Sequence, residues 1–134
     1  MVEKIFRSQC PISSGLDLFG DKWSLLIVRD LLYHSERTFK DFSQSSENIS
    51  SARLADRLSK LEKSGFLTKS KHPTNKKVFL YHLTQKGRDL APILAEFVCW
   101  SNKYLNDHIS EESKLFAEQL KDNREQVLSK YQNP

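Results

Sequence analysis

The chain has 134 residues, of which 38% are hydrophobic, and this size suits one domain with a modest core and one or two appended helices. The formal net charge is +4 and the sequence pI is near 9.1, which mildly favours a polyanionic partner. No apolar run approaches the ~18 residues of a membrane span, and the first residues lack the apolar core of a signal peptide. We therefore expect a cytoplasmic protein with no membrane partner.

The positive charge is concentrated in one segment. Between Arg53 and Arg88 the only acidic residues are Asp56 and Glu62, whereas acids outnumber basic residues from Asp89 onward. Such a local excess indicates a polyanionic partner more strongly than the net charge does.

The sequence predicts no metal site, no cofactor and no enzymatic activity. Cys10, Cys99 and four scattered histidines stand in none of the spacings that hold zinc. No combination of nucleophile, base and orienting group can be recognised, and no glycine-rich loop could cradle a phosphate.

Two helices are predicted near the N-terminus. The first follows Cys10-Pro11, because proline is favoured at the first helical position, and it ends at Gly20. Asp21 should cap the second helix, Lys22 to Tyr33, whose side chains are apolar almost all round. We expect this second helix to be the buried centre of the fold.

A helix-turn-helix arrangement is predicted next. Thr38, with an acid three residues later, resembles a capping box at the start of a short helix that ends near Ser45. After a short turn, Ser50 should cap an amphipathic helix that Gly65 ends. Its apolar stripe consists of Leu54, Leu58 and Leu61.

Small and cationic residues lie beside this leucine stripe. Arg53, Arg57 and Lys60 recur at i, i+4 and i+7, and Ser51 and Ala52 lie at the helix tip. Small residues at a helix N-terminus allow close approach to a DNA major groove, and long cationic ones reach guanine edges or phosphates. A solvated charged face is the plain alternative, and this helix alone does not decide between the two.

A β-hairpin is predicted directly after this helix. Residues 67–72 and 78–83 form two extended runs around a turn at Pro73 to Lys76. A hairpin in this place is the wing of a winged helix, and lysines and a histidine crowd its tip. Lysines on edge strands also protect against aggregation, but their clustering at the turn after a basic helix favours DNA binding.

The C-terminal part is predicted to be helical. Thr84 should cap a long helix that Pro92 bends or loosens by one turn, and Ser110 should start the last helix. These helices carry more apolar surface than a small winged-helix core covers, so we expect a second subunit to cover it.

The resulting fold class is mostly α with a small β-hairpin wing: a winged helix-turn-helix with extra N- and C-terminal dimerisation helices. We expect one domain over residues 1–134, with the winged-helix core at about 10–90 and dimerisation helices at about 11–19 and 85–131.

The pattern resembles the HxlR-type transcriptional regulators of bacteria and archaea over roughly residues 10 to 104. The matching elements, in order, are Cys10-Pro11, Gly20 to Ser24, Arg37 to Phe42, Ile49-Ser50, Leu54, Arg57-Leu58, Leu61-Glu62, Gly65, Tyr81 to Gly87 and Trp100. The wing strand Phe79-Leu80-Tyr81 and the helix after Asp107 depart from the family pattern. The resemblance implies a homodimeric winged-helix DNA-binding protein, related in build to the MarR group, whose N- and C-terminal helices form the interface.

The predicted function is sequence-specific binding of double-stranded DNA by a homodimer that recognises an inverted-repeat operator. The residues expected to face bases are Ser51, Ala52, Arg53, Asp56 and Arg57. The residues expected on or near phosphates are Thr38, Ser50, Lys60, Lys71, His72, Lys76 and Lys77. The alternative is a winged helix used as a protein-interaction module, whose basic face meets an acidic partner without sequence-specific DNA binding.

The resemblance also implies that Cys10 is a redox or electrophile sensor, because members with a cysteine at this N-terminal position include such sensors. A helix N-terminus and the nearby Lys4 and Arg7 would stabilise its thiolate. A cysteine before Pro11 can equally pack at a dimer interface, and both interpretations stay open. Cys99 is expected to be a buried structural thiol.

Overall fold

The computed structural model describes residues 6–134. Lys4, which the sequence places near Cys10, lies outside the described residues. The elements in chain order are α1 (Pro11–Phe19), α2 (Ser24–Tyr33), α3 (Phe39–Ser43), α4 (Ser51–Lys63), β1 (Leu67–Lys71), β2 (Phe79–Leu83), α5 (Gln85–Arg88), α6 (Ala91–Tyr104) and α7 (Glu111–Gln132). The predicted fold class, mostly helical with one antiparallel hairpin, is confirmed. Within residues 6–134, none of the helices has the length and apolar character that a membrane span requires.

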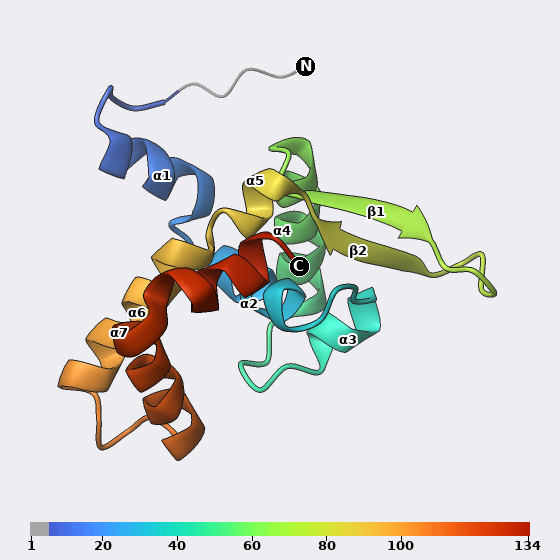
Figure 1. The fold of residues 1–134 in the computed structure, drawn as a ribbon. Coiled ribbons are helices and arrows are strands. Elements are labelled where there is room, and N and C mark those ends of the chain that lie inside the picture. The colour runs from blue at the N-terminus through green and yellow to red at the C-terminus, as the bar shows by residue number, and fades with distance from the viewer. Residues whose placement is uncertain (1–5) are drawn as a thin grey trace.

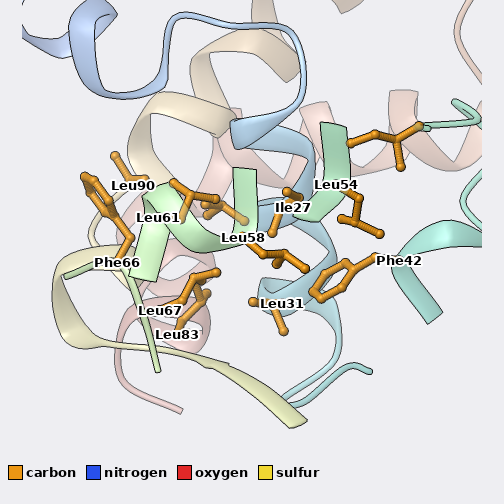
Figure 2. Packing of buried hydrophobic residues seen from close by; sticks show 12 residues of the cluster. Ile27, Leu31, Phe42, Leu54, Leu58, Leu61, Phe66, Leu67, Leu83 and Leu90 are labelled. Atoms are coloured by element: carbon orange, nitrogen blue, oxygen red, sulfur yellow. The ribbon is translucent and has the colours of Figure 1, made fainter. Parts of the chain in front are cut away.

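The main core lies where α2, α3, α4 and the hairpin meet. The predicted stripe of Leu54, Leu58 and Leu61 is buried, as is Phe42 of α3. Figure 2 shows the α4 leucines gathered with Ile27 and Leu31 of α2 and with Leu67 and Leu83 of the two strands. Burial of this stripe therefore fixes which side of α4 remains outside.

The hairpin follows α4 after a left-handed turn. Gly65 has φ of +84°, a conformation that glycine adopts without steric cost, so it ends the helix as predicted. The strands pair from Leu67 opposite Leu83 to Lys71 opposite Phe79, and each is one residue shorter at the turn than predicted. The hairpin projects from the body, with its turn at the far end (Figure 1).

A short bridge ties the start of the helix-turn-helix to the wing. Arg37 and Tyr81 exchange backbone hydrogen bonds, with the Arg37 N–H donating at 3.2 Å and the Tyr81 N–H donating at 2.8 Å. Pairing between residues so far apart leaves no local signal in the sequence.

Helix α2 differs from its prediction in start and burial. The Asp21 carboxylate accepts hydrogen bonds from the Trp23 and Ser24 N–H groups, but residues 21–23 form a turn and the helix begins at Ser24 rather than Lys22. Ser24, Ile27, Val28 and Leu31 are buried on one face. Leu25 and Leu32 on another face are only partly buried, so α2 is not enclosed all round.

The prediction of one long helix after Thr84, bent or loosened at Pro92, is wrong because the structure has two separate helices there. Thr84 caps the four-residue α5, where its hydroxyl accepts from the Gly87 N–H, and α6 is a separate helix beginning at Ala91. Pro92 lies in the first turn of α6, where a missing N–H costs no helical hydrogen bond, so it starts a helix instead of bending one.

Helices α6 and α7 form a second, smaller cluster around Ala95, Leu120 and Val127. Asn123 has non-helical dihedrals (φ −141°, ψ 51°), and α7 is kinked there. The end of α7 is tied to α5, because the Arg88 guanidinium donates to the Tyr131 carbonyl at 3.0 Å. The C-terminal helices thereby form a pair that is anchored beside the winged-helix core (Figure 1).

Candidate nucleic-acid interface

The two helices of the helix-turn-helix are held by side-chain caps. The Thr38 hydroxyl accepts from the Asp41 N–H at 3.1 Å, and the Asp41 carboxylate accepts from the Thr38 N–H at 2.9 Å, which confirms the capping box. The Ser50 hydroxyl accepts from the Arg53 N–H at 3.3 Å. Each hydroxyl can still donate its own proton, so both remain suited to a phosphate.

Helix α4 presents an outward stripe opposite its buried leucines. Ala52, Asp56, Ser59 and Lys63 follow one another at helical spacing and are all exposed. Ser51 and Arg53, predicted to face bases, are also exposed at the N-terminal tip. Sequence reasoning missed Ser59 and Lys63, although their spacing of seven and eleven residues from Ala52 places them on the same stripe.

Arg57 lies on the flank of α4 nearest α2 and is paired with two carboxylates. Its guanidinium is 3.2 Å from Asp21 Oδ1 and 2.5 Å from Asp56 Oδ2, and its side chain is only 23% exposed. Asp56 also lies 3.3 Å from Lys60 Nζ. Two of the five residues predicted to face bases, Asp56 and Arg57, therefore have charged groups that are already engaged within the protein.

Both carboxylates of this network have lowered pKa values. Burial raises the pKa of Asp21, but hydrogen bonds from the Ser24 hydroxyl and from two backbone N–H groups, together with the Arg57 charge, outweigh burial. The hydrogen bond from Arg57 is the main reason that the pKa of Asp56 is lowered, and Lys60 adds to it. Asp56 is thus an ionised acceptor on the outward stripe, which suits a cytosine amino group better than a phosphate.

The wing carries the predicted cations at its far end. Lys71, Lys76 and Lys77 are exposed, and no structural hydrogen bond occupies their ammonium groups within residues 6–134. His72 Nδ1 lies 3.2 Å from both the Thr74 and Asn75 N–H groups, so it accepts from them and holds the turn. His72 therefore shapes the wing first, and only its Nε2 remains for a phosphate.

Lys86 is a basic residue whose role is structural. Its ammonium donates to the Ser64 carbonyl at 2.7 Å and lies 4.7 Å from the centroid of the Phe66 ring. It joins α5 to the C-terminal end of α4. The basic segment recognised in the sequence therefore contains both exposed cations and cations used inside the fold.

Cys10 is exposed at the N-cap position of α1, in extended conformation, directly before Pro11. Arg7, expected to influence this thiol, instead forms an ion pair with Asp17 of α1. Cys99 is partly buried and packs against the second cluster. Within residues 6–134, no three His, Cys, Asp or Glu side chains are grouped so that they could hold a metal ion.

The chain matches known proteins in both sequence and fold. The family model described as HxlR-like helix-turn-helix matches residues 18–109. YvaP, an uncharacterized HTH-type transcriptional regulator of Bacillus subtilis, is 34% identical over 98 residues, which cover 72% of this chain and 90% of YvaP. The HTH-type transcriptional regulator YodB of the same organism is 30% identical over 111 residues, covering 81% of this chain and 98% of YodB.

Solved structures support the same relationship. PA1607 superposes with a TM-score of 0.66 and 32% identity, over 78% of this chain and 70% of that chain. The reduced form of YodB superposes with a TM-score of 0.59 and 29% identity, over 72% of this chain and 95% of that chain. YodB structures are also known in quinone-bound and diamide-treated forms.

These relatives are transcriptional regulators, a class without enzymatic activity. The buried leucine stripe of α4, the Thr38 capping box and the hairpin lie within the matched residues 18–109. The chain therefore belongs to the HxlR-like helix-turn-helix family of transcriptional regulators and has the winged-helix fold.

Proposed function

We propose that this regulator binds a specific DNA sequence as a homodimer and that its operator is an inverted repeat. The observation that carries this proposal is the exposed tip and outward stripe of α4, where small Ser51 and Ala52 stand beside the long Arg53. A helix with small residues at its N-terminus can approach base edges in the major groove.

The proposed contacts divide into two groups. Base contacts come from Ser51, Ala52, Arg53, Asp56 and Arg57, and phosphate contacts come from Thr38, Ser50, Lys60, Lys71, His72, Lys76 and Lys77. The second group draws on both helix N-caps and on the wing, so it would grip the DNA backbone on either side of α4. Affinity should then fall steeply with salt as counterions are released from the neutralised phosphates.

Two unpartnered apolar surfaces support the homodimer. Helix α1 touches the core only at its C-terminal end and has no buried residue, with Ile12 74% and Leu16 55% exposed (Figure 1). On α6, Phe97, Trp100 and Tyr104 are each 58–60% exposed along one face. Apolar faces of this kind on a small protein are typical of subunit interfaces. A second copy would cover both through the predicted dimerisation helices, about 11–19 and 85–131.

An inverted repeat follows from two-fold symmetry. A dimer of this kind presents two α4 helices to successive major grooves on one side of the duplex, so half-sites should lie about one helical turn apart. Selection of bound fragments from genomic DNA tests this directly, because it yields half-site sequence and spacing together.

We expect the selected fragments to share such a repeat and to lose their enrichment with Arg53→Ala. Fragments without any common sequence would reject sequence-specific binding. In that case the protein-interaction module, with its basic face against an acidic partner, would be the better account.

We also propose that Cys10 makes the regulator responsive to electrophiles or oxidants. The thiol is exposed at a helix N-terminus beside the proposed dimer surface, and a relative, YodB, has been solved in quinone-bound and diamide-treated forms. Its sulfur can add to a quinone carbon, forming a C–S bond while the thiol proton passes to oxygen and the quinone becomes a hydroquinone. With diamide, the Cys10 thiols of the two subunits give up two protons and two electrons to the N=N bond and form a disulfide between the subunits.

Operator binding by the wild type, Cys10→Ser and Cys99→Ser, with and without diamide or benzoquinone, tests this role. We expect both reagents to change the operator affinity of the wild type and of Cys99→Ser but not that of Cys10→Ser. Circular dichroism checks that each variant is folded. A full response of folded Cys10→Ser would leave Cys10 with only a packing role.

A further inference from the structure

A cavity of about 420 Å³ lies between α2 on one side and α6 and α7 on the other. Its wall is mostly apolar, with two tyrosines, Tyr33 and Tyr131, and three charged residues, Asp21, Lys22 and Arg29. This volume falls in the range of small-molecule sites, well above the space of a single side chain. The cavity is separate from the outward stripe of α4.

The space arises from small residues on α6 and from the kink in α7. Ala91 and Ala95 line the cavity from successive turns of α6, and their short side chains leave more room than longer ones would. The kink at Asn123 lets both halves of α7 reach the cavity, with Phe116 from one half and Tyr131 from the other, their ring centroids 6.2 Å apart.

The cavity and the proposed dimer surface lie mainly on different faces of α6. Its α6 residues Ala91, Leu94, Ala95 and Val98 follow one helical stripe, whereas Ile93, Trp100 and Tyr104 lie on the opposite face of the helix. Phe97 belongs to the aromatic face and also lines the cavity, so the two surfaces meet at this residue. A second copy that covers the aromatic face would border the cavity at Phe97 without reaching the stripe of Ala91, Leu94, Ala95 and Val98.

The charged residues of the cavity wall are largely engaged with protein partners. The Arg29 guanidinium donates to both Glu47 oxygens at 2.9 and 3.0 Å and to Asp30 at 3.0 Å. The Asp21 oxygens accept from Trp23, Ser24 and Arg57. Lys22 is exposed and its ammonium lies 5.0 Å from the Trp23 ring centroid. No buried charge is thus left for a charged ligand in this part of the structure.

The cavity is also connected to α4. Helix α2 turns Leu25 and Leu32 toward the cavity and Val28 and Leu31 toward the core that holds the α4 leucines. Asp21, which lines the cavity, both caps the turn before α2 and pairs with Arg57 of α4. A molecule that shifts α2 would therefore move both the packing of α2 on the α4 leucines and the ion pair between Asp21 and Arg57.

We propose that this cavity binds an uncharged, apolar small molecule, and that Asp21 transmits its presence to Arg57 and so to DNA binding. The binding site stands on the cavity alone, whereas its effect on DNA rests on the proposed function. Such a ligand shifts the conformation of α4 only as far as it prefers one position of α2 over another.

The test uses 1-aminoanthracene, an uncharged aromatic probe whose fluorescence rises in apolar surroundings. We expect saturable binding of one probe per chain to the full chain. Val98→Phe and Ala95→Leu fill the cavity and should lower the affinity for the probe by about tenfold or more. Lys103→Phe, on the same helix beyond the cavity, should leave this affinity unchanged. Two filling variants, each checked by circular dichroism, guard against misfolding of one.

Several outcomes would overturn the binding site: no saturable binding, equal binding by folded filling variants, or binding only at dilutions where the chain is monomeric. The last result would mean that a second copy fills the cavity. Equally tight binding of the anion 8-anilinonaphthalene-1-sulfonate at the same site would overturn the ligand class.

Operator affinity tests the connection. The probe should change operator affinity several-fold in the wild type and leave it unchanged in Asp21→Asn, which keeps a capping oxygen but loses the charge that holds Arg57. An equal effect in both proteins would overturn the role of Asp21. If the chain binds the probe but selects no operator, the proposed function is rejected and the binding site remains. If it selects an operator but does not bind the probe, only the binding site is rejected.

Discussion

In the proposed complex, the Arg57 guanidinium would exchange its ion pairs with Asp21 and Asp56 for a DNA base. These ion pairs are partly exposed to solvent, and such pairs are weak. A bidentate contact between arginine and guanine discriminates against the wrong base by about 1–3 kcal/mol. The proposed base contact would therefore replace weak pairs, which orient the guanidinium in the free protein.

The proposed base contact of Arg57 predicts how its loss would affect DNA recognition. Arg57→Ala should reduce the preference for operator over random DNA by about 1–3 kcal/mol, because a base contact is lost. Lys76→Ala should weaken all sequences alike and lower the salt dependence, because the wing lysine contacts phosphate. Competition binding with operator and random duplexes measures both. An unchanged preference in Arg57→Ala would leave Arg57 as a residue that only orients α4 against α2.

At the scale of elements, α5 is the joint between the winged-helix core and the C-terminal helices. The Thr84 N–H donates to the Phe66 carbonyl at 3.0 Å, and the Thr84 hydroxyl donates to the Gly65 carbonyl at 2.6 Å. Gly87 packs against the same segment: a Cβ there would lie 2.4 Å from the Phe66 carbonyl oxygen and 2.8 Å from Leu83 Cδ2. This close approach requires glycine, since backbone cannot move aside cheaply.

Gly87→Ala should therefore lower the free energy of unfolding by about 1–3 kcal/mol, the range typical of overpacking a buried site. Gly15→Ala in α1 is the matched control, because its added Cβ would meet only the Phe19 side chain at 3.4 Å. Alanine at that helical position should be neutral or stabilising by up to about 1 kcal/mol. Urea denaturation measures both variants. Equal stabilities would show that the Gly87 contact relaxes without cost.

At the scale of the whole molecule, the chain divides its apolar residues between closed cores and open faces. The winged-helix core and the cluster between α6 and α7 are closed within the chain. The α1 stripe and the aromatic face of α6 are open. This division is what a dimeric DNA-binding protein requires, because the distance between its two α4 helices must be set by helices outside the DNA-binding core.

Light scattering tests the dimer. We expect the wild type to have the mass of two chains at micromolar concentration, and Trp100→Glu and Ile12→Glu to be monomeric, because each places a charge in an apolar interface. Gln126→Glu, exposed on α7, should remain dimeric. Operator affinity should fall in the monomeric variants, since each monomer contacts one half-site. A wild type that is monomeric in both low and moderate salt would remove the basis for an inverted repeat.

The sequence by itself determined the features that depend on neighbouring residues. The Thr38 capping box, the Ser50 cap, the leucine stripe of α4 and the glycine that ends it were all predicted and confirmed. So was the hairpin, within one residue at its turn. Caps, helical periodicity and turns involve residues a few positions apart, so the sequence displays them directly.

The tertiary structure alone decided what depends on residues far apart in the chain. The pairing of Asp21 with Arg57, the bridge from Arg37 to Tyr81 and the cavity beside α2 bring together side chains or backbone from separate elements. The break between α5 and α6 was not predicted either, although Pro92, whose missing N–H favours a helix start, marks it in the sequence. The contacts between separate elements follow from packing in three dimensions, and no periodicity in the sequence records them.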